Sequence, residues 1–307
     1  MLALATIGFA ARPTLAATYY VTVAGLGGEP DYEQRFTQLA QDADRVFKAS
    51  GAAGAVYTLS GNTATRARLI ETLQQLAKVA TAADDFVLLL IGHGSFDGTQ
   101  YKFNLVGPDI SAEELASLCN HIAAGRQLIV NTSSASGGAL GMLEKPGRAL
   151  IAATKSGTEK NAPVFARYWL EALQDTTADV DKNDTISALE AFQYAATKTA
   201  AFYSTQKRLA TEHAVFEDTG KQQPVRVADK ASGEGRLLAS ITLVRFGGAQ
   251  QTITDPAKHA LLLKKEQLEQ TIDRLKYQRA ALAPDDYRQK LTAALLELAK
   301  VQQELDK

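Results

Sequence analysis

Charge and composition narrow the classes of protein to which this 307-residue chain can belong. It has 33 Lys and Arg against 34 Asp and Glu, for a formal net charge of -1, so no surface-wide field attracts nucleic acid or anionic lipid. Its hydrophobic content of 46% is ordinary for a globular protein with a sizeable core. The only cysteine is Cys119, which excludes an intramolecular disulfide and a cysteine metal cluster.

Residues 1–17 resemble a secretory signal peptide. An apolar segment from Leu2 to Ala11 is followed by an Arg-Pro pair and by small residues that end at Ala17. The segment is shorter than the roughly 20 residues that a membrane helix needs, and no other run approaches that length. We therefore expect no membrane span and a periplasmic or secreted protein whose mature chain begins near Thr18. A signal peptide normally has a positively charged segment before its apolar run, and no Lys or Arg precedes this one. The alternative interpretation of residues 1–17 is therefore an irregular start of the chain.

Strand-like and helix-like segments alternate over the next part of the chain, 18–254. Strands are expected at 19–23, 55–59, 86–91, 127–131, 149–153 and 236–244, and helices at 31–50, 63–80, 111–123, 163–173 and 187–203. Strands that are apolar throughout are typical of a parallel sheet covered on both faces. The pattern predicts a three-layer α/β/α sandwich with a mostly parallel sheet, in which 236–244 is an edge strand.

The last segment, 255–307, has a different composition. Leu and Ile recur at steps of three, four or seven on both sides of a Pro-containing turn at 283–286, which predicts an α-helical hairpin. Lys265, Arg279 and Gln302 occupy seam positions, so the expected coiled coil is imperfect. The hairpin can fold back on itself, dock on the α/β domain or pair with another copy to form a homo-oligomer.

Two of the apolar strands are followed by loops that contain candidate catalytic or ligand-binding residues. The strand at 86–91 is followed by Gly-His-Gly-Ser, which contains His93, and the strand at 127–131 by Thr-Ser-Ser-Ala-Ser-Gly-Gly, which contains Ser134. In open parallel sheets, ligands and chemistry collect at the carboxyl ends of the strands. We therefore expect His93 and Ser134 to share one site. Asp97 is either a partner of His93 or a turn residue.

This succession of strand, His-Gly loop, helix, strand and small-residue loop resembles the caspase/legumain clan of cysteine peptidases over roughly 18–244. The Gly-His-Gly-Ser segment resembles the clan's catalytic histidine motif. Residues 132–137 lie over the legumain-like Glu-Ala-Cys-Glu-Ser-Gly, which places Ser134 where the clan has its cysteine. The segment 153–159 resembles the legumain segment that helps to line the substrate cleft. The resemblance thus implies a caspase-like fold and cleft residues Ser156, Gly157 and Glu159.

Replacing sulfur by oxygen at this position predicts a loss of peptidase activity. A thiol with a pKa of about 8.5 is easily poised as a thiolate, whereas a serine hydroxyl needs a well-aligned base. In the clan that this chain resembles, the cysteine and the histidine lie on separate loops without a tight hydrogen bond. No Gly-x-Ser-x-Gly elbow indicates a separately evolved serine hydrolase.

The expected function is therefore that of a pseudopeptidase, which binds a peptide or protein partner through the inherited cleft. One alternative is a serine-type peptidase or esterase with a Ser134/His93 dyad. In that enzyme His93 would be the base, Ser134 the nucleophile, and the amides of Gly94 and Ser134 the donors to the oxyanion. Another alternative is a scaffold protein that acts through its C-terminal coiled coil.

Residues 179–190 follow the pattern of an EF-hand calcium loop. Oxygen ligands fall at loop positions one, three, five, seven, nine and twelve, which are Asp179, Asp181, Asn183, Thr185 (through its carbonyl), Ser187 and Glu190. Asp184 stands where Gly normally makes the sharp turn, but Asp tolerates a positive φ better than most residues. We therefore expect a bound calcium ion with a structural role. The alternative is a solvated acidic loop that caps the helix beginning near Ser187.

Overall fold

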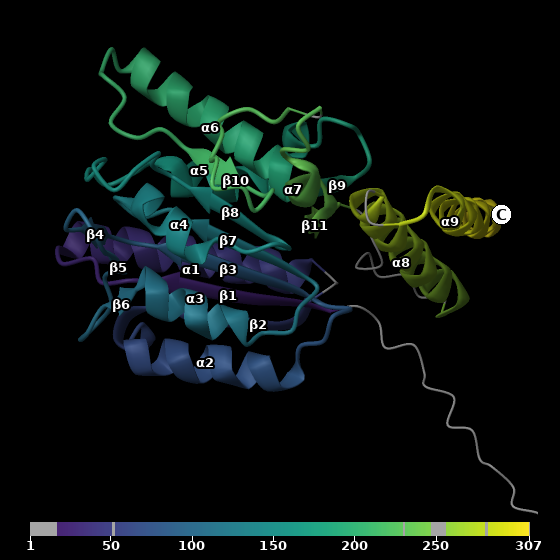
Figure 1. Ribbon diagram of the computed structural model, residues 1–307, viewed down its shortest axis with the longest axis horizontal. Helices are drawn as coiled ribbons and strands as arrows, with labels where there is room; N and C mark the ends of the chain where they lie inside the picture. The colour runs from purple at the N-terminus through teal and green to yellow at the C-terminus, as the bar shows by residue number, and fades with distance from the viewer. Residues whose placement is uncertain (1–16, 51–52, 230, 247–255, 280–281, 307) are drawn as a thin grey trace, which may run out of the picture.

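The computed structural model describes residues 17–50, 53–229, 231–246, 256–279 and 282–306. Apart from Ala17, the predicted signal peptide at 1–17 lies outside the described residues, as does the predicted boundary at 254–255. Among the described residues, no helix combines the length and the apolar character that a membrane span requires. The ribbon has a central sheet between layers of helices, with two further helices at one end (Figure 1).

The central sheet has six strands in the order β10-β8-β7-β3-β1-β2. The five strands from β8 to β2 run parallel, and β10 pairs antiparallel with β8 at the edge. All residues of β3, β7 and β8 are buried, which confirms the predicted, mostly parallel sheet covered on both faces. The strands are β1 (Thr18–Ala24), β2 (Ala53–Leu59), β3 (Asp85–Ile91), β7 (Arg126–Asn131), β8 (Arg148–Ala152) and β10 (Val215–Glu217).

Helices cover both faces of this sheet because each strand sends alternate side chains to opposite sides. In β3, Val87 and Leu89 join the core beneath one helical layer, whereas Leu88 and Leu90 join the other. The first layer consists of α1 (Pro30–Ala49), α5 (Phe165–Ala172) and α6 (Ala188–Thr205). The second consists of α2 (Arg66–Val79), α3 (Ala112–Asn120) and the short α4 (Leu140–Leu143). The predicted three-layer α/β/α sandwich is therefore confirmed.

The predicted edge strand at 236–244 is wrong. Its first part forms the helix α7 (Arg236–Ser240), and its second part belongs to β11 (Thr242–Arg245). β11 pairs antiparallel with β9 (Thr185–Ser187) in a separate two-stranded sheet. The edge of the main sheet is instead the three-residue strand β10, which the sequence patterns did not predict.

A buried carboxylate explains why α7 is a helix. Asp218 lies just after β10, and its two oxygens accept hydrogen bonds from the amides of Gly235, Leu237 and Leu238 at 2.9 to 3.1 Å. A carboxylate that accepts the first amides of a helix stabilises its N-terminus. Because this cap comes from 17 to 20 residues away in the sequence, the local apolar pattern alone did not reveal it.

The remaining elements surround the carboxyl ends of the strands or form short turns. A three-stranded antiparallel sheet consists of β4 (Gly94–Phe96), β5 (Tyr101–Phe103) and β6 (Ile110–Ser111). Short 3-10 turns occur at Gly61–Thr63, Ser136–Ala139 and Thr176–Ala178. In Figure 1 the β4–β6 sheet lies at the end of the molecule opposite the two C-terminal helices.

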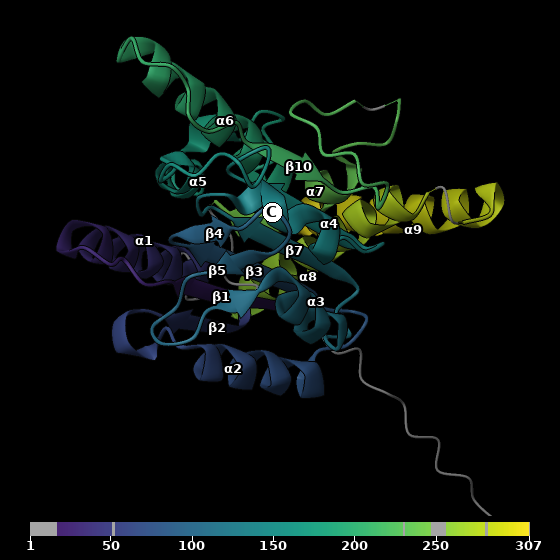
Figure 2. The ribbon, with the colours of Figure 1, turned by 60° about the vertical axis from the view of Figure 1, so that its left-hand side comes forward.

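The predicted C-terminal hairpin is present as α8 (Pro256–Gln278) and α9 (Pro284–Leu305). The two helices share a small core that contains Ile272, Leu275 and Ala294. The hairpin also docks on the α/β domain, because Tyr277 packs against the main core and Glu269 accepts a hydrogen bond from Arg245 at 3.2 Å. Figure 2 shows α8 beside the domain, with α9 extending outwards. Pairing with another copy stays a prediction.

Candidate functional site

The His93 and Ser134 loops lie side by side because they follow neighbouring strands. β3 and β7 pair in parallel, with Leu90 opposite Asn131 near their carboxyl ends. His93 comes two residues after β3, and Ser134 three residues after β7. Two hydrogen bonds join the loops: the Gly94 amide donates to Ser134 Oγ at 3.1 Å, and Ser134 Oγ donates to the Gly94 carbonyl at 3.0 Å.

These two bonds occupy the Ser134 hydroxyl. The residue is only 3% exposed, and its oxygen both accepts and donates a hydrogen bond within the protein. The Gly94 amide, predicted as an oxyanion donor, is directed at Ser134 Oγ itself. In the described part of the chain no hydrogen bond joins Ser134 to the His93 ring. In this arrangement the hydroxyl links two loops, and an attack on a substrate would first require its proton to leave the Gly94 carbonyl for a base.

The His93 ring lies in an aromatic corner formed by α1. It meets the rings of Tyr32 and Phe36 edge-on, with centroids 4.7 and 5.1 Å away. Desolvation lowers the pKa of His93, against the opposing effects of a hydrogen bond to the Gly27 backbone and of the charge of Glu29. The lowered pKa favours the neutral imidazole, which can offer one ring nitrogen as an acceptor.

Asp97 is a turn residue and not a partner of His93. Its carboxylate accepts the amides of Thr99 and Gln100, each at 2.8 Å. These bonds lower the pKa of Asp97, which is the usual effect of donors on a carboxylate. Within the described residues, therefore, His93 has no carboxylate that would orient it as a general base of a catalytic triad.

A buried polar network beneath Ser134 was not predicted. Ser133 Oγ lies 2.6 Å from the hydroxyl of Tyr101 and donates to Asn131 Oδ1 at 2.8 Å. Burial raises the pKa of Tyr101 to about 12, so the phenol stays neutral and can donate a hydrogen bond. Satisfied polar networks of this kind rigidify their surroundings. Its sequence signal is the presence of Asn131 and Ser133 in an otherwise fully buried run.

The predicted cleft residues Ser156, Gly157 and Glu159 lie beside the Ser134 loop. The Glu159 carbonyl accepts the amide of Ala135, the residue after Ser134, at 2.8 Å. A side chain on Gly157 would collide with the ring of Phe96, so this loop packs directly on β4. Ser156 Oγ lies 2.7 Å from Thr158 Oγ1. The structure thus brings these residues next to Ser134, and their contact with a substrate stays a prediction.

His213 is a further residue of this region that sequence reasoning missed. Its Nδ1 hydrogen-bonds to Glu159, whose carboxylate also accepts the backbone amides of His213 at 3.1 Å and of Lys155 at 2.9 Å. Glu159 therefore joins the loop after β8, the Ser134 loop and the segment before β10. No local pattern around His213 could have indicated this contact, because the two residues are 54 positions apart.

The predicted calcium loop forms a compact acidic cluster between the 3-10 turn at 176–178 and α6. Asp179, Asp181 and Glu190 each place a carboxylate oxygen within 4.8 Å of the others. Desolvation and then the charges of Glu190 and Asp179 raise the pKa of Asp181, as mutual repulsion of carboxylates requires. Asp184 has a φ of 60°, the left-handed conformation that the turn was expected to need. This geometry fits a hard cation that takes oxygen ligands.

The same carboxylates also hold the loop together. Asp179 accepts the amides of Asn183 at 3.1 Å and Asp184 at 3.0 Å, and Glu190 accepts those of Val180 and Ser187. The remaining candidate ligands are close to one another: Asn183 Nδ2 donates to Asp181, and Thr185 Oγ1 donates to Asn183 Oδ1. Ser187 and Glu190 form a capping box at the start of α6, as the alternative interpretation expected.

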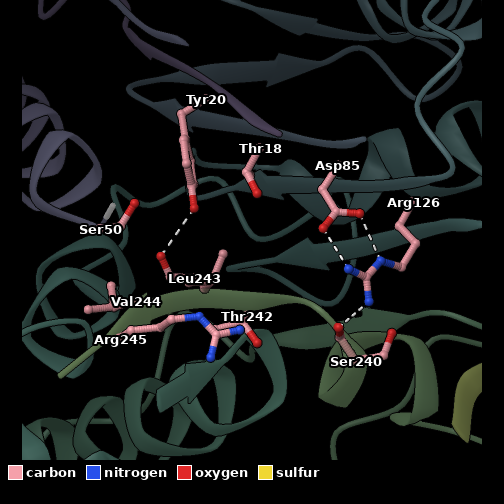
Figure 3. A pocket seen from close by; sticks show the side chains of 10 residues that line it. All are labelled: Thr18, Tyr20, Ser50, Asp85, Arg126, Ser240, Thr242, Leu243, Val244 and Arg245. Carbon is pink, nitrogen blue, oxygen red and sulfur yellow. Dashed lines mark hydrogen bonds and ion pairs between the residues drawn. The ribbon is translucent and has the colours of Figure 1, made fainter. Parts of the chain in front are cut away.

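A separate enclosed cavity lies at the amino ends of the strands, away from Ser134 (Figure 3). Its polar wall contains the buried ion pair of Arg126 with Asp85, and Arg126 Nη1 also donates to the Ser240 carbonyl. Arg245 lines the same cavity, and its Nη2 has no hydrogen-bond partner among the described residues. The volume of about 10 Å³ holds roughly one water molecule, so the cavity is too small for a peptide.

No family model matches the sequence, and no curated protein matches it. Among solved structures, the Drosophila initiator caspase Dronc is similar with a TM-score of 0.45 and 10% identity, over 68% of this chain and 81% of that chain. Caspase-1 from Spodoptera frugiperda is similar with a TM-score of 0.45 and 12% identity, over 66% and 86%. These likenesses are weak, and the fold is established by the strand order and register of this chain. The legumain-like branch stays a prediction.

Proposed function

We propose that this chain is an exported, caspase-like pseudopeptidase, which binds a peptide or protein partner through the surface between the His93, Ser134 and Glu159 loops. The observation that carries the proposal is the double hydrogen bond between Ser134 Oγ and Gly94, at 3.1 and 3.0 Å. A hydroxyl held in this way lacks the aligned base that a serine nucleophile needs. The group that it engages is the amide that would stabilise an oxyanion.

The neighbouring groups support a role in binding. The neutral His93 ring, fixed by Tyr32 and Phe36, can accept a hydrogen bond from a peptide amide. The three loops are tied to one another through Gly94–Ser134 and Ala135–Glu159 bonds, so little ordering would be needed on binding. A preformed site binds more tightly for the same contacts because less conformational entropy is lost.

A peptide-display selection tests this function. Peptides enriched on the wild-type protein should bind at least tenfold more weakly to a Ser156→Trp variant, whose bulky ring would cover the proposed surface. A Gln75→Trp variant carries the same ring on the exposed side of α2 and should bind as the wild type does. Enriched peptides that bind Ser156→Trp unchanged would show that this surface is not the binding site.

Calcium at the acidic loop is part of the same proposal, with a structural role. Its ligands would come from Asp179, Asp181, Asn183, the Thr185 carbonyl, Ser187 and Glu190. A divalent ion would relieve the carboxylate repulsion and hold α6 against the preceding turn. Because β9 lies within this loop and pairs with β11, the ion would also steady the strand that leads towards the hairpin. A periplasmic or extracellular location supplies calcium.

The hairpin has a proposed role in assembly. Leu295 and Leu296 on α9 are 47% and 60% exposed, although the opposite side of this helix packs on α8. Exposed leucines on the outer side of a hairpin helix can be covered by a second copy of the same hairpin. Assembly would present two binding surfaces in one particle, which raises the avidity for a repeated or dimeric partner.

A further inference from the structure

The end of α6 and the 206–214 loop, which leads from α6 to β10, project from the α/β domain (Figures 1 and 2). All residues from 204 to 210 are exposed. Leu209 is 91% exposed, the highest value among the large hydrophobic side chains that the structure describes. An exposed loop tip of this kind is a preferred place for cleavage of a folded chain.

The backbone of the loop is held at its start and then released. The amide of Lys207 donates to the Ser204 carbonyl and that of Arg208 to the Tyr203 carbonyl, each at 3.0 Å. Together with the φ of 51° at Lys207, these bonds form the turn that commonly ends a helix. The backbone of residues 209–211 makes no hydrogen bond with any residue that the structure describes. This stretch can therefore become fully extended without loss of backbone hydrogen bonds.

The loop at 219–229 is also exposed and contains basic residues, but its backbone is fastened. The amide of Lys221 donates to the Glu217 carboxylate at 3.3 Å. Val225 exchanges two backbone hydrogen bonds with Phe216, both at 2.8 Å. An endopeptidase would have to break such bonds before the chain could enter its active site. The 206–214 loop does not impose this cost between residues 209 and 211.

The side chains of the loop indicate which class of endopeptidase would cut it. Lys207 and Arg208 are adjacent, and both are exposed. Endopeptidases of the trypsin type hold a long cationic side chain in a pocket with a carboxylate at its base, and they cut the bond that follows this residue. The bond between Arg208 and Leu209 lies directly before the stretch without backbone hydrogen bonds, which makes it the best placed of the two bonds that follow a basic residue.

Buried contacts anchor the chain on both sides of this bond. Before it, Tyr203 is only 6% exposed, and its hydroxyl donates to the Glu212 carboxylate at 3.0 Å. After it, the same carboxylate accepts the amides of Val164 at 2.7 Å and Phe165 at 3.2 Å. Phe216 of β10 lies in the main core, and β10 pairs with β8. A cut in the loop would therefore leave the core and the sheet intact.

We propose that the peptide bond between Arg208 and Leu209 is a processing site for an endopeptidase of the trypsin type. In this reaction one water molecule adds across the bond. The carbonyl carbon of Arg208 takes the oxygen and becomes a carboxylate, and the nitrogen of Leu209 takes the protons and becomes an ammonium group. The product is a protein of two fragments that stay assembled. Such processing requires no ligand at the surface between the His93, Ser134 and Glu159 loops.

Limited proteolysis of the native full-length protein with trypsin tests the proposal. Intact-protein mass spectrometry should detect a C-terminal fragment that begins at Leu209 before any other product. The two fragments should elute together in size-exclusion chromatography, because the buried contacts on both sides of the cut remain. The double variant Lys207→Gln and Arg208→Gln should lose intact chain at least about tenfold more slowly than wild type, since its loop no longer offers a basic side chain.

A second double variant separates the effect of the loop from that of lost charge. Lys221→Gln together with Arg226→Gln removes two basic residues from the exposed loop at 219–229 and should be cut at the wild-type rate. Circular dichroism should give both double variants the melting temperature of wild type, so slower cleavage cannot come from higher stability. A first cut elsewhere in the chain, or fragments that separate, would overturn the proposal. Equal cleavage rates of the Lys207→Gln and Arg208→Gln variant and wild type would overturn it as well.

Discussion

Ser134 Oγ and the backbone of Gly94 form a reciprocal pair of hydrogen bonds. The hydroxyl accepts a hydrogen bond from the amide at 3.1 Å and donates one to the carbonyl at 3.0 Å. The pair joins the loops that follow β3 and β7, at the position where the sequence resemblance predicts a nucleophile. A side chain that completes two backbone hydrogen bonds in a buried position contributes to stability, which is independent of any role in catalysis.

Removing this hydroxyl should therefore destabilise the protein. Ser134→Ala leaves the amide and the carbonyl of Gly94 without their partner, and the free energy of unfolding should fall by about 1–3 kcal/mol. Urea denaturation followed by circular dichroism measures this change. Ser95→Ala, at an exposed position of β4, should change the free energy by less than about 0.5 kcal/mol. Equal stability of Ser134→Ala and wild type would contradict the linking role.

The lowered pKa of His93 makes stability depend on pH. The unfolded chain binds a proton on this ring near the ordinary pKa of 6.5, whereas desolvation keeps the folded-state pKa below that value. Stability from this residue is complete above pH 6.5 and is lost as the pH falls towards the folded-state pKa. The difference in unfolding free energy between wild type and His93→Gln should thus shrink from pH 7.5 to pH 5.5. A difference that grows over this range would exclude a lowered pKa.

The buried ion pair of Asp85 and Arg126 should be worth far more than an exposed one. Both side chains are at most 10% exposed, and Arg126 also holds the Ser240 carbonyl at the start of the link to β11. Arg126→Met would leave a buried carboxylate without a partner, at a cost of about 3–5 kcal/mol in unfolding free energy. Arg68→Met, which breaks an exposed pair with Glu71, should cost less than about 1 kcal/mol. Similar losses in the two variants would contradict this assignment.

Calcium should bind the acidic loop and stabilise the protein. Ion at about 100 times its dissociation constant should raise the unfolding free energy by about 2.7 kcal/mol. Asp181→Asn should weaken binding in isothermal titration calorimetry after chelation, because it removes a charged ligand. Asp285→Asn, on the exposed first turn of α9, should leave it unchanged. Absence of both heat and a change in melting temperature at about millimolar calcium would rule out the site.

The exposed leucines of α9 give a test of assembly. If the hairpin pairs two copies, light scattering should give a multiple of the 32.9 kDa monomer mass for wild type. Leu295→Glu combined with Leu296→Glu should return the protein to a monomer, since like charges would meet at the proposed contact. Gln74→Glu together with Gln75→Glu adds the same charge to exposed positions of α2 and should leave the mass as in wild type. A monomeric wild-type protein would count against assembly through the hairpin.

The sequence was sufficient for the five parallel strands of the main sheet because the central ones are apolar and buried on both faces. β3, for example, is buried at every residue, and a short, uniformly apolar run of this kind is typical of a strand in a covered parallel sheet. The hairpin was equally clear from its leucine spacing. The positions of His93 and Ser134 at one edge followed from the general rule for parallel sheets.

Features that depend on distant partners could not be predicted. β10 has only three residues, and it is a strand because it pairs with β8. α7 depends on the cap from Asp218. The side chain of Glu159 is held by a hydrogen bond with His213, which is 54 residues away. The hydrogen bonds of the Ser134 hydroxyl could not be predicted either. They form because the pairing of β3 with β7 brings Gly94 next to Ser134. A single sequence specifies local periodicity much more directly than such contacts.

The central claim is that Ser134 links two loops and is not a nucleophile. The most direct test is intact-protein mass spectrometry after incubation with a fluorophosphonate probe, which forms a covalent adduct with activated serines. The account predicts no adduct on the wild-type protein under conditions that fully label a serine peptidase. An adduct that maps to Ser134, is lost in Ser134→Ala and persists in Ser95→Ala would contradict it and would support the Ser134/His93 hydrolase instead.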